Sequence, residues 1–333
     1  MASKKKIRVG VIGAGGISQV AHIPNLLAEP AAKLVALCDS DPGRAAILAD
    51  RFEIPNWYDL PEKMFHNESM DCVIIATPTI SHLPLCQLAL ESGIDVMVEK
   101  PFARNADEAR RIVEIARHTG QILMVGMNHR FREDTDHLKR LLDTGELGEI
   151  MTVRAGWLKR IGVWGRPYWF TDPNLSGGGV MIDLGIQMID LICYILGFPT
   201  VVQAVGSVSH KMLELEVEDS ATAFIRFANE VTFTLEVSWA NCERGDVAYT
   251  FISGSQGGAS LDPLHLTRRQ GNRVIEISPP GLGDSVELYH RSFKLEIAHF
   301  IDCVRRNAKP LSSGPEALAA LEVVEQLYQS SGQ

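Results

Sequence analysis

Lys100 is the residue whose position and neighbours most favour catalytic chemistry. It follows the apolar run of a strand predicted over Asp95–Glu99 and precedes Pro101. The carboxyl end of a parallel strand is where open α/β sheets bind ligands. An ammonium there can hydrogen-bond a substrate hydroxyl, lower its pKa and favour alkoxide character as hydride leaves. A solvated surface lysine is the alternative, but Glu99 as an orienting group and Pro101 as a backbone constraint favour catalysis.

A second set of polar side chains lies on a glycine-led helix predicted at about 177–196. Asp183, Gln187 and Asp190 stand at i, i+4 and i+7, so they share one helix face among apolar neighbours. Buried polar groups need partners, and a substrate with several hydroxyls would supply them. A hydrogen-bonded core network is the alternative, above all for Asp190.

A glycine-rich turn stands between a predicted first strand and a first helix. Its residues are Gly13, Gly15, Gly16 and Ile17, followed by Ser18 in place of the third glycine of G-x-G-x-x-G. Backbone N–H groups and a helix N-terminus in such a turn can receive a pyrophosphate. The motif alone is weak evidence, but the strand–turn–helix context is the one that a dinucleotide site requires.

Asp39 ends the second predicted strand about 20 residues after the glycine turn, where a carboxylate binds the adenosine ribose hydroxyls and repels a 2′-phosphate. This favours NAD as the cofactor. A turn or helix-capping aspartate is the alternative. Arg44 keeps NADP open, because a guanidinium there could meet a phosphate.

Another strand end carries Thr77 and Pro78, with His82 beginning the next helix. The carboxyl edge of the sheet again favours cofactor contact. An ordinary strand-to-helix turn and a surface histidine are the alternative reading.

The pattern of elements changes near residue 130. Before it, β-branched runs alternate with amphipathic helices, which predicts a doubly wound parallel sheet. Its strands are expected at Ile7–Ile12, Leu34–Asp39, Cys72–Thr77, Asp95–Glu99 and Ile122–Met127, and its helices near 17–28, 42–52, 81–92 and 105–119. After a helix near 133–144, strands at about 151–160, 200–211, 218–228, 231–240 and 247–253 predict a mostly antiparallel sheet, and two helices near 288–307 and 315–329 close the chain.

Length and composition agree with two domains. A chain of 333 residues with 46% hydrophobic residues can build two cores, so we predict a dinucleotide-binding domain over 1–130 and a substrate-binding and oligomerisation α+β domain over 131–333, with the final helices able to pack on the first domain. A net charge of −9 gives no basic surface for nucleic acid or membranes. Six scattered cysteines without a C-x-x-C pair, no signal-peptide core and no apolar stretch near 20 residues indicate a cytoplasmic protein. We predict no metal site.

In this order and spacing, the motifs resemble the glucose-fructose oxidoreductase / inositol dehydrogenase / MocA family of two-domain dehydrogenases over nearly the whole chain. They are the glycine turn, Thr77-Pro78 with His82, Glu99-Lys100-Pro101, Asn128-His129-Arg130-Phe131, Gly177-Gly178-Gly179 with Asp183 and Asp190, Gly254 to Gly257, and Glu296-Ile297-Ala298-His299-Phe300. The resemblance implies that Lys100 is the catalytic lysine. It also implies that the second sheet forms the floor of the substrate site and commonly a subunit interface, hence a homodimer or homotetramer.

The sequence departs from the family at Gln187, where the usual motif has an acid/base histidine. An amide can orient a hydroxyl or carbonyl, but it does not titrate near neutral pH. Lys100, if desolvation lowers its pKa, Asp183 or Tyr168 could take the proton instead. We favour Lys100, with Asp183 and Gln187 positioning the substrate.

The segment 157–170 is rich in aromatic and cationic residues, which suit sugar rings and an anionic substituent. Arg166 and Tyr168 are its candidate substrate contacts, with domain packing or a subunit contact as the alternative. Arg130 is ambiguous between a substrate contact and an inter-domain ion pair.

The sequence therefore predicts an NAD(P)-dependent oxidoreductase that acts on a small sugar, polyol or related secondary alcohol or ketone. Two other functions stay open. One is a glycosidase or lyase that retains NAD and oxidises its sugar transiently, and the other is a non-catalytic cofactor-binding scaffold or sensor, which the absence of the histidine would suit.

Overall fold

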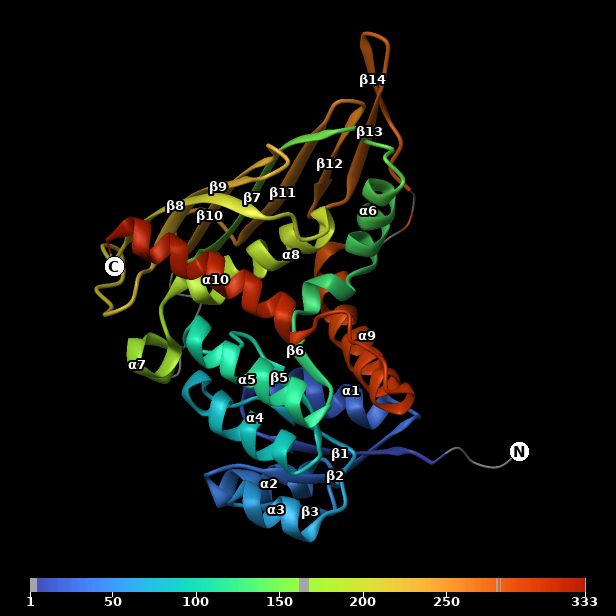
Figure 1. Cartoon of the computed structure of the whole chain (residues 1–333), viewed down its shortest axis with the longest axis vertical. Helices are drawn as coiled ribbons and strands as arrows, with labels where there is room; N and C mark the ends of the chain where they lie inside the picture. The colour runs from blue at the N-terminus through green and yellow to red at the C-terminus, as the bar shows by residue number, and fades with distance from the viewer. Residues whose placement is uncertain (1–4, 162–167, 280, 282, 333) are drawn as a thin grey trace. The chain divides into compact units, whose positions relative to one another are not determined.

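The computed structural model describes residues 5–161, 168–279, 281 and 283–332 (Figure 1). The chain divides into two compact units. The first comprises Met1–Asn128 with His290–Leu318, and the second comprises His129–Tyr289 with Ala319–Gln333. The main division is close to the predicted boundary at residue 130, and a segment near the C-terminus belongs to the first unit.

A parallel six-stranded sheet forms the centre of the first unit, in the order β3-β2-β1-β4-β5-β6. Its strands are β1 Ile7–Ile12, β2 Ala32–Cys38, β3 Asn56–Tyr58, β4 Cys72–Ile75, β5 Asp95–Glu99 and β6 Leu123–Gly126. The strand order reverses between β1 and β4, and dinucleotides bind at the carboxyl ends of strands where this occurs. The predicted doubly wound fold is confirmed, with β3 as an additional edge strand.

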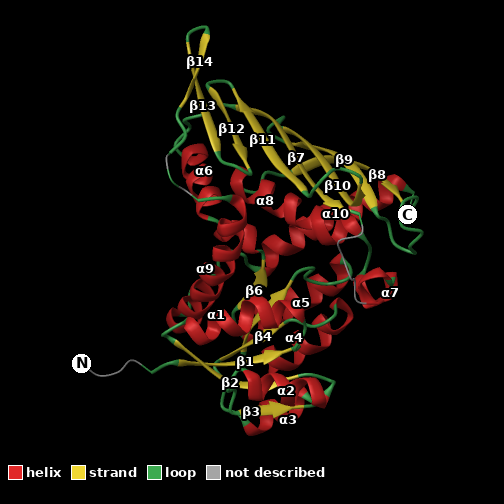
Figure 2. Ribbon diagram, turned by 180° about the vertical axis from the view of Figure 1, so that it is seen from behind, coloured by secondary structure: helices red, strands yellow, loops and turns green. Residues whose placement is uncertain are grey.

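Helices alternate with these strands (Figure 2). They are η1 Ser18–His22, α1 Ile23–Ala28, α2 Pro42–Arg51, α3 Pro61–Asn67, η2 Thr79–Ser81, α4 His82–Glu91, α5 Ala106–Thr119 and η3 Asn128–Phe131. Asp41 begins α2 by accepting hydrogen bonds from the N–H groups of Gly43 and Arg44. Asn105 caps α5 in the same way, and Gly120 ends that helix with φ 74°.

The second unit contains an eight-stranded sheet in the order β14-β13-β12-β11-β7-β10-β9-β8. Its strands are β7 Ile150–Arg160, β8 Val201–Ser209, β9 Ser220–Phe227, β10 Thr232–Asn241, β11 Val247–Gly254, β12 Gly257–Leu261, β13 His265–Gln270 and β14 Arg273–Glu276. Among the described strands of this sheet, only β7 and β10 pair in parallel, which confirms the mostly antiparallel sheet. Along β9, Ile225 and Phe227 are buried while Phe224 and Arg226 are exposed, so one face of the sheet covers a core and the other faces solvent.

The remaining helices are α6 Glu133–Asp143, η4 Tyr168–Thr171, α7 Pro173–Ser176, η5 Met181–Gly185, α8 Ile186–Leu196, α9 Ser285–Arg306 and α10 Gly314–Ser331. The helical segment Pro173–Leu196 is long and apolar enough to cross a membrane by length and composition, so the expectation that no stretch approaches a membrane span was wrong. However, 89% of its apolar window is buried inside the protein, as in the core helix of a soluble fold. α6 and α8 contact each other, and α8 also contacts β7.

Candidate functional site

The glycine turn has the geometry of a phosphate-binding loop. Gly13 has φ 99°, and a Cβ there would lie 2.3 Å from the carbonyl oxygen of Ala76, so no other residue fits. A Cβ added to Gly15 or Gly16 would meet nothing within 4 Å, which leaves open space in front of their backbone. The buried Ser18 donates from Oγ to the carbonyl oxygen of Gly13 at 2.5 Å and thereby ties the helix to the turn. The residues present therefore fit a dinucleotide pyrophosphate.

Asp39 is buried beside this turn. Its Oδ2 accepts from the N–H of Ala14 at 2.8 Å, and its Oδ1 accepts from the N–H of Asp41 at 2.9 Å. The Arg44 guanidinium lies 3.6 Å from Asp39 Oδ1 and 3.5 Å from Asp41 Oδ2. Two carboxylates thus balance the cation that could have received a 2′-phosphate, which favours NAD over NADP.

His82 is buried rather than a surface histidine. Its Nδ1 lies 3.0 Å from the carbonyl oxygen of Pro101 and 3.3 Å from that of Phe102, while its Nε2 lies 3.0 Å from that of Thr77. Burial lowers the pKa of His82, although these carbonyl oxygens and Glu99 act in the opposite direction. The ring therefore links the Thr77-Pro78 turn to the segment after Lys100.

Glu99 is the last residue of β5, and Lys100 follows it at the carboxyl edge of the sheet. Glu99 is buried, and its Oε1 lies 2.7 Å from Nε2 of His22, while its Oε2 accepts from the backbone N–H of Lys100 at 3.1 Å. Burial alone would raise the pKa of Glu99, but the hydrogen bond and charge of His22 and the charge of Lys100 lower it below its usual value. An ionised carboxylate therefore stands next to the half-buried lysine.

In the second unit, Asp183 lies on η5 and Gln187 on the first turn of α8. Both are buried. Trp239 donates from Nε1 to Asp183 Oδ2 at 2.9 Å, and Gln187 donates from Nε2 to the carbonyl oxygen of Asp183 at 2.8 Å. The carboxylate is thus oriented by an indole, and the amide nitrogen of Gln187 is engaged within its own helix.

Asp190 and Arg130 do not belong with these residues. The Arg130 side chain is fully buried and donates to both carboxylate oxygens of Asp190, with distances of 2.8 and 2.5 Å. Its guanidinium also stacks on the rings of Tyr194 and Phe198. Both partners of this ion pair lie within the second unit, so the pair with Asp190 does not join the two units. The role of Arg130 as a substrate contact stays a prediction. Asp190 therefore belongs to a hydrogen-bonded core network, the alternative given for it from the sequence.

Glu218 packs so closely against the segment before the helix that position 179 requires glycine. Its carboxylate accepts from the N–H groups of Gly179 and Met181 at 3.0 and 2.9 Å and from the hydroxyl of Tyr328 at 2.7 Å. A Cβ on Gly179 would lie 2.1 Å from the carbonyl oxygen of Glu218. The close approach anchors the helical segment that carries Asp183.

Sequence reasoning missed Glu218, Trp239 and His22. The sequence shows a tryptophan near the end of a strand (Trp239) and an acidic residue before another (Glu218). Their hydrogen-bond partners lie far away in the sequence, so no local pattern marks either residue as part of the site. Arg166 lies outside the described residues, as does the side chain of Tyr168, so both stay predictions.

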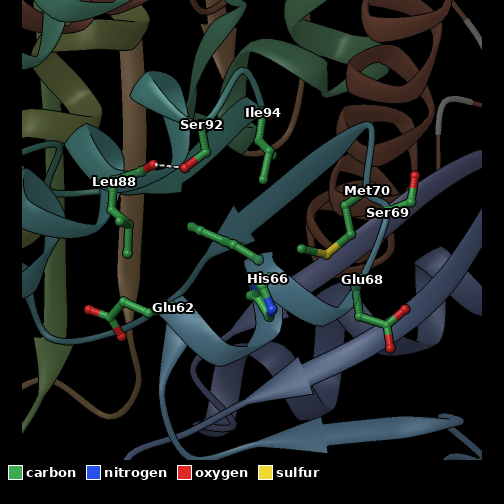
Figure 3. Close-up of a pocket in the computed structure, with 9 residues that line it drawn as sticks. Glu62, His66, Glu68, Ser69, Met70, Leu88, Ser92 and Ile94 are labelled. Atoms are coloured by element: carbon green, nitrogen blue, oxygen red, sulfur yellow. Dashed lines mark hydrogen bonds between the residues drawn. The ribbon is translucent and has the colours of Figure 1, made fainter.

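A hollow of about 400 Å³ occurs elsewhere in the first unit (Figure 3). It is lined by Glu62, Phe65, His66, Glu68, Ser69, Met70, Leu88, Ser92 and Ile94. Met70 lies two residues before β4 and Ile94 directly before β5, so the hollow lies at the amino ends of these strands, away from the glycine turn. Among the described residues, no group of three His, Cys, Asp or Glu side chains could hold a metal ion.

Two family models match the chain. Residues 7–127 match the GFO/IDH/MocA oxidoreductase family with an NAD-binding Rossmann fold, and residues 135–260 match a GFO/IDH/MocA C-terminal domain. These ranges include the glycine turn, Lys100 and Asp183.

Similar proteins extend over the same length. D-glucoside 3-dehydrogenase of Escherichia coli (strain K12) is 31% identical over 343 residues, covering 98% of this chain and 95% of the relative. The scyllo-inositol 2-dehydrogenase (NAD(+)) of Bacillus subtilis (strain 168) is 29% identical, covering 96% and 92%. The crystal structure of an oxidoreductase from Agrobacterium radiobacter, in complex with NAD+, L-tartaric acid and magnesium, matches the fold with a TM-score of 0.88 at 24% identity, covering 99% and 97% of the two chains.

Proposed function

Because this chain belongs to the GFO/IDH/MocA family of oxidoreductases, with an NAD-binding Rossmann fold, we propose that it transfers hydride between NAD and a secondary alcohol or ketone of a sugar or polyol. The observation that carries the proposal is Lys100, which directly follows β5 at the carboxyl edge of the sheet, beside the ionised Glu99. The names of the full-length relatives, one acting on a glucoside and one on an inositol, support the substrate class.

The chain's own residues would divide the work as follows. Bound NAD supplies the nicotinamide that accepts or returns the hydride. Lys100 holds the reacting oxygen and takes or returns its proton. Asp183, held by Trp239, and Gln187 orient neighbouring hydroxyls of the substrate, because a carboxylate and an amide present fixed acceptors and donors.

The proposal is tested by titrating the purified protein with NADH and then screening glycosides, inositols and ketosugars for a change in NADH absorbance. We expect NADH to bind and at least one compound with a ring secondary alcohol to reduce NAD. Failure of NADH to bind would contradict the proposal.

Changing Asp39 to Asn should weaken the binding of NAD and reduce the preference of the protein for NAD over NADP. The amide keeps one acceptor oxygen but loses the charge that repels a 2′-phosphate, and loss of a charged hydrogen bond corresponds to about a tenfold weaker Kd for NADH. Fluorescence titrations with NADH and NADPH measure both values. Asp50→Asn, an exposed change on α2, is the control. An unchanged ratio of the Kd values for NADH and NADPH in Asp39→Asn would show that Asp39 does not select the cofactor.

We further propose a cytoplasmic homodimer or homotetramer. Free thiols at Cys38, Cys72, Cys86, Cys193, Cys242 and Cys303 suit a reducing compartment. The solvent-facing side of the second sheet exposes Val205, Phe224 and Phe251, with a hollow of about 480 Å³ over β8, β9, β10 and β11. An apolar face of this kind suits contact with a second copy of the chain. A measurement of the molar mass in solution tests this, because a mass of one chain would contradict the proposed dimer or tetramer.

A further inference from the structure

His22 is a fully buried histidine of the first unit, and the proposed reaction assigns it no role. It ends the π-helical turn η1, which follows directly after the glycine turn. Pro24 has no N–H to donate to the carbonyl of Val20, so a regular α-helix cannot continue through this point. The wide turn is where His22 meets β5.

The imidazole makes one hydrogen bond to the carboxylate of Glu99, with Nε2 2.7 Å from Oε1. The lowered pKa of Glu99 means that the carboxylate is ionised and can only accept. Nε2 must therefore carry the proton that is shared with Glu99. This fixes the orientation of the ring and of the carboxylate together.

Glu99 has little freedom to move. A Cβ added to Gly126 on β6 would lie 3.2 Å from Oε1, so the carboxylate packs directly against the neighbouring strand. Its other oxygen holds the backbone N–H of Lys100. A chain of contacts thus leads from the helix after the glycine turn, through Glu99, to the main chain of the lysine.

We propose that His22 is a positioning residue, which acts through Glu99 to place Lys100 for the reaction. The inference rests on the proposed function of Lys100. The charges of both His22 and Lys100 act on the Glu99 carboxylate, which without His22 draws the Lys100 ammonium toward itself and away from the substrate.

The test compares His22→Ala, His22→Gln and the exposed His118→Ala on α5 as a matched control. Single-turnover hydride transfer should fall about 10- to 100-fold in His22→Ala, the range expected when a reacting group is displaced by about 1 Å. The Kd for NADH should stay within about twofold of wild type, because no cofactor contact is removed. His22→Gln should recover most of the rate, since the amide can donate from near the position of Nε2.

A second measurement does not need turnover. In the protein without cofactor, a limiting amount of acylating reagent labels Lys100, and mass spectrometry gives the rate. His22→Ala should slow this labelling, because Lys100 is drawn to Glu99. A mere loosening of the fold would expose Lys100 and speed its labelling.

Faster labelling, an unchanged hydride-transfer rate in His22→Ala, or no recovery in His22→Gln would each overturn the inference. Lys100→Met in the same assay distinguishes a failure of the proposed role of Lys100 from a failure of the proposed role of His22. If it transfers hydride at the wild-type rate, the proposed role of Lys100 fails; if it is inactive while His22→Ala is unaffected, only the role of His22 fails.

Discussion

Lys100→Met should lower the rate of single-turnover hydride transfer by about 10²- to 10⁴-fold, the contribution expected from a positioned acid/base group. Met keeps the length and much of the apolar surface of the lysine stem but removes the only titratable group of that side chain. The Kd for NADH should change little, because the pyrophosphate turn is intact. Rapid mixing of enzyme, NAD and substrate with detection of NADH measures the rate.

Gln187→Ala is the comparison variant for this experiment. Because an amide does not titrate, its loss should raise KM for the substrate by about tenfold with a smaller effect on the single-turnover rate. Equal single-turnover rates for Lys100→Met and wild type would contradict the assignment of Lys100. A collapse of the rate in Gln187→Ala with KM unchanged would contradict the positioning role of Gln187.

Arg130→Met should lower the free energy of unfolding by about 3–5 kcal/mol, since it leaves the Asp190 carboxylate buried without its partner. The pair is fully buried and makes two hydrogen bonds, so neither solvent nor salt can substitute for the guanidinium. Urea unfolding followed by circular dichroism measures the change.

Arg140→Met provides the matched control. Arg140 pairs with Asp136 one turn away on α6, but both side chains are largely exposed, with 75% and 50% of their surface accessible. Loss of an exposed pair should cost about 1 kcal/mol or less. If Arg130→Met were as mild as Arg140→Met, or if it weakened substrate binding in a fully stable protein, the structural assignment of Arg130 would be wrong.

Most of the fold was predictable from the period of the apolar residues. β1 and β5 fall at the predicted bounds, because short β-branched runs that are buried on both faces stand out from their surroundings. β3 was missed since its residues are exposed or half-buried at the sheet edge and carry no apolar run. β14 was missed as well, because it is a four-residue edge strand whose residues are all exposed.

Residues of the candidate site could be predicted only where the signal lies within one short segment of the sequence. The glycine turn, Asp39 and Lys100 are local signals at strand ends. The hydrogen bond of Trp239 to Asp183 joins residues 56 positions apart, and that of His22 to Glu99 joins residues 77 apart, which no local pattern can show. Asp190 fitted the polar stripe of its helix as well as Asp183 did, and only its partner Arg130 separates the two.

The transfer of deuterium to NAD tests the central claim most directly. A sugar or polyol that passes the absorbance screen is labelled with deuterium at its secondary carbinol carbons and mixed with NAD and enzyme, and mass spectrometry follows the label. We expect one deuterium per turnover to appear on the cofactor, transferred as deuteride, and to accumulate there as substrate is consumed. Label that returns to the product while NADH never accumulates would indicate the cofactor-retaining chemistry of a lyase or glycosidase, and product formed without any label on the cofactor would contradict hydride transfer altogether.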